Sequence, residues 1–226
     1  MTELDLSLPR FQLEADLAAA VEAVRQDLLA GPIELVRRGA DVVLRLTNKA
    51  HYERPLQIVL EVQGLARALL EARPECMPIV NLASETARPL PELYGRGKAE
   101  GARMRGDLRA RIEAWLARLD GRSARIDAQR ARLLMAPEVV VVTAAALDGE
   151  SAFFPPGISW LPAAQRYVVA GAEKFVPANY AFNSARYARV PLEDWDGVLT
   201  GDSDEPQSPE EVRRAIASLR FETILL

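Results

Sequence analysis

The chain has 226 residues, of which 49% are hydrophobic and 27% charged, and its formal net charge is −4. This composition is typical of a globular protein with a sizeable core and excludes the sparse hydrophobicity of a disordered chain. A single cysteine, Cys76, excludes an internal disulfide framework, and with one histidine it excludes a zinc site of the Cys/His type.

The first third of the chain predicts a helical bundle. Apolar residues recur there at the 3.6-residue spacing of amphipathic helices in three successive segments. We expect helices over 11–30, over 32–47 and over 55–73, and Pro74 ends the last of them because a residue before proline is pushed out of helical geometry. The short connections favour antiparallel packing of the three helices.

Two further helical segments follow, and the second is strongly basic. We expect a short helix over 79–86, and a long helix that begins near Lys98 and breaks at Gly121 before a last helical segment over 123–135. Residues 96–132 include eleven basic and five acidic side chains. This excess of basic charge suits an acidic partner, but nucleic acid is not expected because aromatic stacking residues are nearly absent.

The last third predicts a sheet. The continuous β-branched run 139–142 predicts a strand of a parallel sheet that is buried on both faces. Further strands are expected over 167–171, 197–200 and 221–225. A helix over 209–219, with Ser208 as its N-cap, lies between the last two of these strands, and the loop over 201–209, rich in Asp, Ser and Pro, is expected to be mobile.

Together these elements predict an α/β protein with an N-terminal helical bundle followed by a small, mostly parallel sheet. The expected domains are a helical domain over 1–95, long connecting helices over 96–135 and a small α/β domain over 136–226. The acidic N-terminus and the lack of a run of about 18 to 20 apolar residues predict a cytoplasmic protein without a membrane span.

Sequence motifs that would identify a catalysed reaction are missing. The chain lacks a G-x-x-x-x-G-K-[ST] phosphate loop, a G-x-G-x-x-G turn and a G-x-S-x-G elbow, and His51 lies in a polar break between helices. No cofactor and no metal are therefore expected. The segment 167–184 offers one candidate group, because Glu173 follows a buried strand and the carboxyl ends of parallel strands line ligand crevices.

Four segments resemble those of the translation initiation factor 2B alpha/beta/delta family, which includes ribose-1,5-bisphosphate and methylthioribose-1-phosphate isomerases. A D-x-x-x-G-[AP] step matches residues 27–32, and an A-R-P-x-x-x-P-x-x-N corner matches 72–81. The family's G-A-D followed by Asn-Lys is similar to Gly171-Ala172-Glu173 followed by Asn183-Ser184, and 196–201 is similar to its closing strand. The resemblance implies a Rossmann-like second domain.

The chain departs from the isomerases of this family where their chemistry is expected. They use a cysteine after the first strand of the second domain, together with the G-A-D aspartate. Here no cysteine occurs in 139–148, Glu173 replaces the aspartate, and Thr143-Ala144-Ala145-Ala146 replaces a phosphate-binding hydroxyl cluster. The chain is also shorter than the isomerases, so part of the second sheet is expected to be missing. These departures point to a member that binds or assembles without isomerising.

The resulting hypothesis is an initiation factor 2B-like protein, without catalysis, that binds a phosphorylated small molecule (a sugar phosphate or a nucleotide) or a partner chain and works as a homo-oligomer. The candidate ligand-binding residues are Arg73, Thr143, Gly171, Lys174, Asn183 and Ser184. Whether the chain is an enzyme stays open. One alternative is a sugar-phosphate isomerase with Glu173 as catalytic general base and Lys174 or Arg186 steadying an enolate. Another is an interaction protein that docks through its basic helix.

Overall fold

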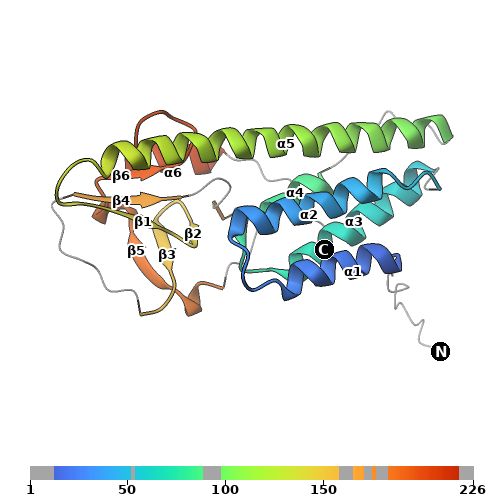
Figure 1. The fold of residues 1–226 in the computed structure, drawn as a ribbon, viewed down its shortest axis with the longest axis horizontal. Coiled ribbons are helices and arrows are strands. Elements are labelled where there is room, and N and C mark those ends of the chain that lie inside the picture. Colours follow the sequence, from blue (N-terminus) through green and yellow to red (C-terminus); the bar gives the residue numbers. More distant parts are fainter. Residues whose placement is uncertain are drawn as a thin grey trace, which may run out of the picture.

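The computed structural model describes residues 13–51, 54–88, 98–157, 165–170, 175–176 and 183–218. In this part of the chain the helices α1 to α5 come first, and the strands and a last helix, α6, follow, which confirms the predicted α/β class (Figure 1). The helices are α1 (Ala15–Gln26), α2 (Pro32–Thr47), α3 (Pro55–Ala72), α4 (Met77–Ala87), α5 (Lys98–Leu133) and α6 (Pro209–Ser218). The strands are β1 (Val139–Thr143), β2 (Ala146–Leu147), β3 (Ser151–Phe154), β4 (Gln165–Val169), β5 (Ala188–Pro191) and β6 (Gly197–Leu199). Two 3-10 turns, Ser184–Arg186 and Leu192–Asp194, flank β5.

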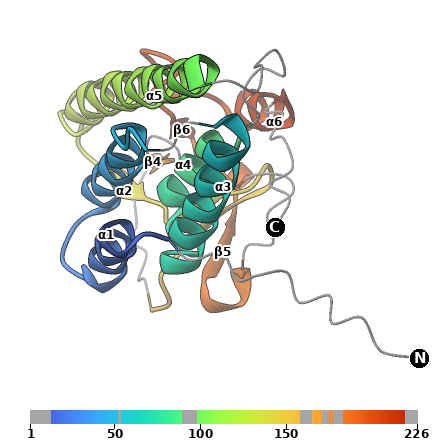
Figure 2. The ribbon, with the colours of Figure 1, turned by 90° about the vertical axis from the view of Figure 1, so that its right-hand side faces the viewer.

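The helices α1 to α5 form a bundle around one apolar core. Seen along the bundle, α2 lies between α1 and α5 (Figure 2). The apolar stripes that predicted these helices face inward, and the core includes fully buried Leu17, Val36, Leu46, Leu65 and Leu108. Pro32 and Pro55 occupy the first positions of α2 and α3, where a missing N–H costs nothing, so both starts are as predicted.

The first helix is shorter than predicted. We expected a helix over 11–30, but α1 ends at Gln26 and the next apolar residue, Leu28, is 81% exposed. The cause is Asp27, whose Oδ1 accepts hydrogen bonds from the backbone N–H groups of Leu29 (3.1 Å) and Ala30 (2.9 Å). This side-chain turn competes with the helix for the same N–H groups. Residues 11 and 12 lie outside the described residues.

The long helix is continuous, so the predicted break at Gly121 is wrong. Nothing lies within 4 Å of the position that a Cβ at Gly121 would occupy, and α5 runs through it without interruption. A single glycine costs a helix only about 1 kcal/mol, which strong helix formers on both sides can offset. The buried positions Ile112, Leu119 and Ile126 keep the helical spacing across the glycine.

The strands form two small sheets. In one sheet β1, β4 and β6 run parallel in the order β1-β4-β6, as predicted. The valines of β1 are only half-buried, so the prediction that this strand is buried on both faces is wrong. Val141 and Val142 each pack against a buried cluster, but neither cluster covers its valine completely. The other sheet, β2-β3-β5, is antiparallel and was not predicted. The strand expected over 221–225 lies outside the described residues.

The loop expected to be mobile, 201–209, begins instead against α5. Arg125 donates to the carbonyl of Gly201 (2.5 Å), Gln129 donates to the carbonyl of Ser203 (2.5 Å), and Arg122 pairs with Asp202 (2.7 Å). The helix after the loop begins with the predicted cap, since the Ser208 hydroxyl accepts from the N–H of Glu211 and the Glu211 carboxylate accepts from the N–H of Ser208.

A buried cluster separate from the bundle core joins the helices to the antiparallel sheet. It contains Leu70 and Met77 from the helices and Ala146 and Phe153 from β2 and β3. Backbone contacts reinforce it, because the Val176 N–H donates to the Leu147 carbonyl (2.8 Å). The loop that joins β1 to β2 is thereby held beside the start of α4, where the candidate site lies.

Candidate functional site

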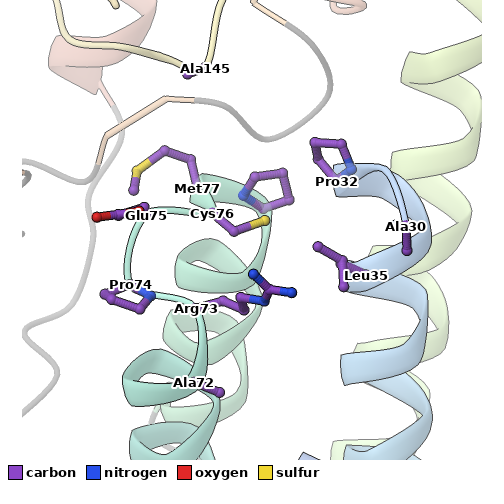
Figure 3. Close-up of a pocket in the computed structure, with 11 residues that line it drawn as sticks. Ala30, Pro32, Leu35, Ala72, Arg73, Pro74, Glu75, Cys76, Met77 and Ala145 are labelled. Atoms are coloured by element: carbon purple, nitrogen blue, oxygen red, sulfur yellow. The ribbon is translucent and has the colours of Figure 1, made fainter. Parts of the chain in front are cut away.

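A cavity of about 330 Å³ lies where the bundle meets the parallel sheet (Figure 3). Three segments far apart in the sequence enclose it: the turn between α1 and α2, the corner between α3 and α4, and the loop after β1. The lining residues are Ala30, Pro32, Leu35, Ala72, Arg73, Pro74, Glu75, Cys76, Met77, Pro78 and Ala145. Two of the three segments are the 27–32 step and the 72–81 corner that carried the family resemblance.

The wall formed by the α1–α2 turn depends on Asp27. Besides the N–H groups of Leu29 and Ala30, its carboxylate accepts a hydrogen bond from Arg38 of α2. The N–H of Ala30, more than any other contact, holds the pKa of the Asp27 carboxyl below its ordinary value of 3.8, and Arg38 acts in the same direction. Asp27 therefore fixes the turn that brings Ala30 and Pro32 to the cavity.

Arg73 joins this wall to the α3–α4 corner. Its Nε donates to the carbonyl of Val24 (3.1 Å), and its Nη2 donates to the carbonyl of Asp27. The carbonyls at the end of a helix have no partner within the helix, so the guanidinium caps the carboxyl end of α1. The predicted ligand residue Arg73 lines the cavity and at the same time holds the wall in place. Ligand binding by Arg73 stays a prediction.

The corner itself combines a thiol, a thioether and a carboxylate. Cys76 is the N-cap of α4 and is partly buried, whereas Met77 is fully buried. In Figure 3 the thioether end of Met77 lies on the same side of the corner as Glu75, below Ala145, and Glu75 points away from α2. Glu75 instead pairs with Arg186 (3.1 Å). The charge of its carboxylate is therefore partly offset by Arg186.

Tyr187 packs beside this ion pair. Burial, followed by the negative charge of Glu75, raises the pKa of the Tyr187 hydroxyl above its ordinary value of 10.0. The ring is only partly buried and packs against the cluster that joins the bundle to the sheets. Together the ring and the Arg186–Glu75 pair tie the segment after Asn183 and Ser184 to the α3–α4 corner, although both of those predicted residues are exposed.

The far side of the cavity is the loop after β1. Thr143 ends this strand and is exposed, and the cavity is lined by Ala145. The N–H of Ala145 donates to the carbonyl of Phe153 (2.8 Å), which fixes the loop to the antiparallel sheet. A methyl group thus faces the cavity where the resemblance implies a hydroxyl cluster.

The remaining predicted residues, Gly171, Glu173 and Lys174, lie outside the described residues. The next residue, Phe175, is among the described ones, and its carbonyl accepts a hydrogen bond from the buried Asn81 amide of α4 (3.2 Å). This contact explains the asparagine of the 72–81 corner in physical terms, because it ties α4 to the chain just after Lys174. The catalytic hypothesis for Glu173 stays a prediction.

Several lining residues were not singled out as site residues. Leu35 and Ala145 both line the cavity, although the sequence predicts neither as a site residue. The available signal was the 27–32 step. In an antiparallel bundle this step, which precedes the proline that begins the second helix, lies at the same end as the 72–81 corner after the third helix. In the described part of the chain, no group of three or more His, Cys, Asp or Glu side chains could hold a metal ion. None of the described helices is long and apolar enough to cross a membrane.

No protein-family model matches the chain, and no curated protein sequence matches it. The fold does match solved structures. The translation initiation factor eIF-2B of Pyrococcus horikoshii OT3 superposes with a TM-score of 0.64 at 11% identity, over 88% of this chain and 99% of that one. The eIF2B beta subunit of Chaetomium thermophilum gives 0.62 at 13% identity over 92% of both chains, and a chain of the tetrameric eIF2B-beta2-delta2 complex of C. thermophilum gives 0.60 at 13% identity over 91% of this chain and 95% of that one.

The chain therefore has the fold of the initiation factor 2B proteins. This confirms, at the level of the fold, the resemblance predicted from the 27–32 and 72–81 segments. The match also covers almost the full length of the solved chains.

Proposed function

We propose that this protein is a cytoplasmic, initiation factor 2B-like binding protein that takes up a phosphorylated small molecule without isomerising it. The observation that carries the proposal is the convergence of the 27–32 turn, the 72–78 corner and the loop after β1 on one cavity. In open parallel sheets, ligands bind outside the carboxyl ends of the strands, and Ala145 in the loop after β1 lines this cavity. A volume of about 330 Å³ suits a small metabolite.

The charges around the cavity favour an anion. The starts of α2 and α4 both line it, and the N-terminal end of a helix carries a partial positive charge. The Arg73 guanidinium adds a full positive charge, while the Glu75 carboxylate is turned toward Arg186. A phosphate group would therefore meet an attractive potential.

Binding is favoured over isomerisation by the position of the thiol. Cys76 lines the cavity from the α3–α4 corner, whereas Ala145 occupies the loop after β1, where the isomerases place their cysteine. The thiol would therefore approach a bound ligand from a different side. The alanine beside β1 supplies no group that could take or give a proton.

The proposal is tested by thermal unfolding with a panel of sugar phosphates and nucleoside monophosphates. A ligand at one hundred times its dissociation constant stabilises the folded state by about 2.7 kcal/mol, which raises the melting temperature of a protein of this size by roughly 5–10 °C. Ala145→Phe should fill the cavity and abolish the shift. Ala102→Phe, at an exposed position of α5, should retain it. If no compound shifts the wild type, the proposal fails.

We further propose that the protein works as a homo-oligomer. One of the solved chains with this fold is part of a tetrameric complex, eIF2B-beta2-delta2. Light scattering of the purified protein should give a multiple of the chain mass, 24.9 kDa. A species of single-chain mass at all concentrations would contradict this part of the proposal.

A further inference from the structure

A seven-residue repeat runs through the second part of the long helix α5. Its units begin at Ala110, Ala117, Ala124 and Ala131 and read ARIEAWL, ARLDGRS, ARIDAQR and ARL. In every complete unit an alanine and an arginine are followed by an aliphatic, an acidic and a small residue. Seven residues is the period at which one helix packs along another in a coiled coil, so the repeat indicates a helical partner for α5.

One face of the repeat is used within the chain. Its aliphatic residues, Ile112, Leu119 and Ile126, are buried against the bundle core and the parallel sheet. The small residues recur at alternating spacings of three and four, which places them on the opposite face of the helix. This face, the α5 seam, consists of Ala110, Ala114, Ala117, Gly121, Ala124, Ala128 and Ala131.

The α5 seam is open to solvent. All six of its alanines are exposed, and nothing lies within 4 Å of the position that a Cβ at Gly121 would occupy. Figure 1 shows that α5 runs along one side of both the bundle and the sheets. The seam extends over 110–131, a length of about 33 Å for an α-helix. Side chains this small allow a second helix to approach closely along that whole length.

Charges of opposite sign border the seam on its two sides. One side carries the arginines of the repeat, Arg111, Arg118, Arg125 and Arg132, and the other carries the acidic residues, Glu113, Asp120 and Asp127. Some of these side chains also form ion pairs within the chain, such as Asp120 with Arg37 and Arg132 with Glu205, but both members of each pair are more than half exposed. Exposed pairs contribute little, so these side chains can also serve another helix.

We propose that a second copy of this chain packs its α5 seam against the first, with the two helices parallel about a two-fold axis. In a parallel pair, each acidic residue lies beside the arginine five residues further along the other helix, which pairs Glu113 with the partner's Arg118. In an antiparallel pair, arginine would face arginine and carboxylate would face carboxylate. The charge pattern therefore selects the parallel arrangement.

The same pattern favours a second copy over a partner of one charge. The seam is bordered by both signs, so it is complementary to itself and would repel one half of a uniformly acidic or basic surface. Self-complementarity is what a two-fold interface requires, because the same patch serves both copies. This inference rests on the homo-oligomer proposed above and names the surface that forms it.

The first experiment compares the masses of the wild type, Ala117→Glu and Ala102→Glu by light scattering. In a parallel pair residue 117 of one copy lies against residue 117 of the other, so Ala117→Glu would bring two carboxylates together in the seam. We expect its mass to fall at least about twofold from that of the wild type, because a two-fold interface is lost. Ala102→Glu, exposed on α5 but outside the repeat, should keep the wild-type mass. Circular dichroism checks that both variants stay folded.

The second experiment tests the direction of the helices without disturbing the seam by charge. Ala110→Cys and Ala102→Cys are made with Cys76→Ser, which removes the chain's own thiol. A disulfide requires two Cα atoms within about 7 Å. With oxidised glutathione, Ala110→Cys should form a cross-linked dimer that a reductant separates, and Ala102→Cys should not. In an antiparallel pair, residue 110 would lie near the far end of the partner's seam.

The outcomes separate this inference from the proposed function. An oligomeric wild type whose mass Ala117→Glu leaves unchanged would overturn the inference, while the homo-oligomer stands. Loss of mass in Ala117→Glu without cross-linking of Ala110→Cys would overturn the parallel arrangement. A wild type of single-chain mass at all concentrations would overturn both the inference and the homo-oligomer.

Discussion

Replacing Arg73 by glutamine should destabilise the whole bundle, and not only a ligand site. Arg73 donates from Nε to the Val24 carbonyl and from Nη2 to the Asp27 carbonyl, and it reaches both from the other side of the cavity. The shorter, neutral glutamine side chain cannot span this distance with two donors. Both carbonyls at the end of α1 would lose a charged partner.

The size of the effect follows from these two bonds. A hydrogen bond from a charged group contributes about 1.5–3 kcal/mol, and the lower value applies to each bond because Arg73 is only partly buried. Loss of both should lower the free energy of unfolding by about 3 kcal/mol, which corresponds to a fall in melting temperature of roughly 6–12 °C for a protein of this size.

The assay is urea unfolding followed by circular dichroism, with Arg67→Gln as the matched control. Arg67 lies in the last turns of α3, shortly before Arg73, and pairs with Glu71, but both side chains are about 60% exposed. An exposed pair of this kind contributes about 0.3–0.5 kcal/mol, so the control should stay close to the wild type. Wild-type stability of Arg73→Gln together with lost phosphate binding would refute the reasoning, since Arg73 would then act on the ligand and not on α1.

Three further predictions concern the turns and the long helix, and all are measured by thermal or urea unfolding. Gly121→Ala should stabilise the protein by about 0.5–1 kcal/mol, because α5 is continuous there and alanine is the better helix former; a loss of stability would contradict the continuous helix. Gly201→Ala should cost about 1–3 kcal/mol, because Gly201 has φ +77° and its Cβ would lie 2.6 Å from the carbonyl oxygen of Arg122; an unchanged midpoint would show that the loop does not lie against α5. The pKa of Asp27 is lowered chiefly by the Ala30 N–H, so the ionised carboxylate stabilises the folded state fully above the ordinary value of 3.8, and this stabilisation is lost as the pH falls through the lowered value. Asp27→Asn should therefore flatten the loss of stability in that acid range. Asp41→Asn, at an exposed site, is the control and should not flatten it.

The local rules of helix formation predicted most of the bundle. Proline at the first position located the starts of α2 and α3, and Ser208 as N-cap located the start of α6. The same local rules failed at Asp27 and at Gly121, where two local preferences compete. At Asp27 the side-chain turn prevailed over an apolar pattern, and at Gly121 the continuing helix prevailed over the glycine.

The sheet and the cavity were harder to predict because they depend on contacts between distant segments. The β-branched run predicted the strand β1 but not its half-burial, because the burial of a strand depends on what packs over it and is not encoded in the strand itself. Leu35 fits both a core position and a cavity wall, since its helical spacing is the same in either case. Arg73 could be singled out only because the 72–81 corner resembles a known family.

The cavity and the bundle share the residues that hold them together. Arg73 and Asp27 close the end of α1, and the same two residues set the distance between the α1–α2 turn and the α3–α4 corner that bounds the cavity. On the other side, the Asn81 amide joins α4 to Phe175, and the cluster around Met77 joins α4 to β2 and β3. The walls are therefore parts of caps and core contacts that the fold needs in any case. Such a cavity keeps its shape whichever reactive groups line it. The binding that we propose therefore does not require the groups that isomerisation would need.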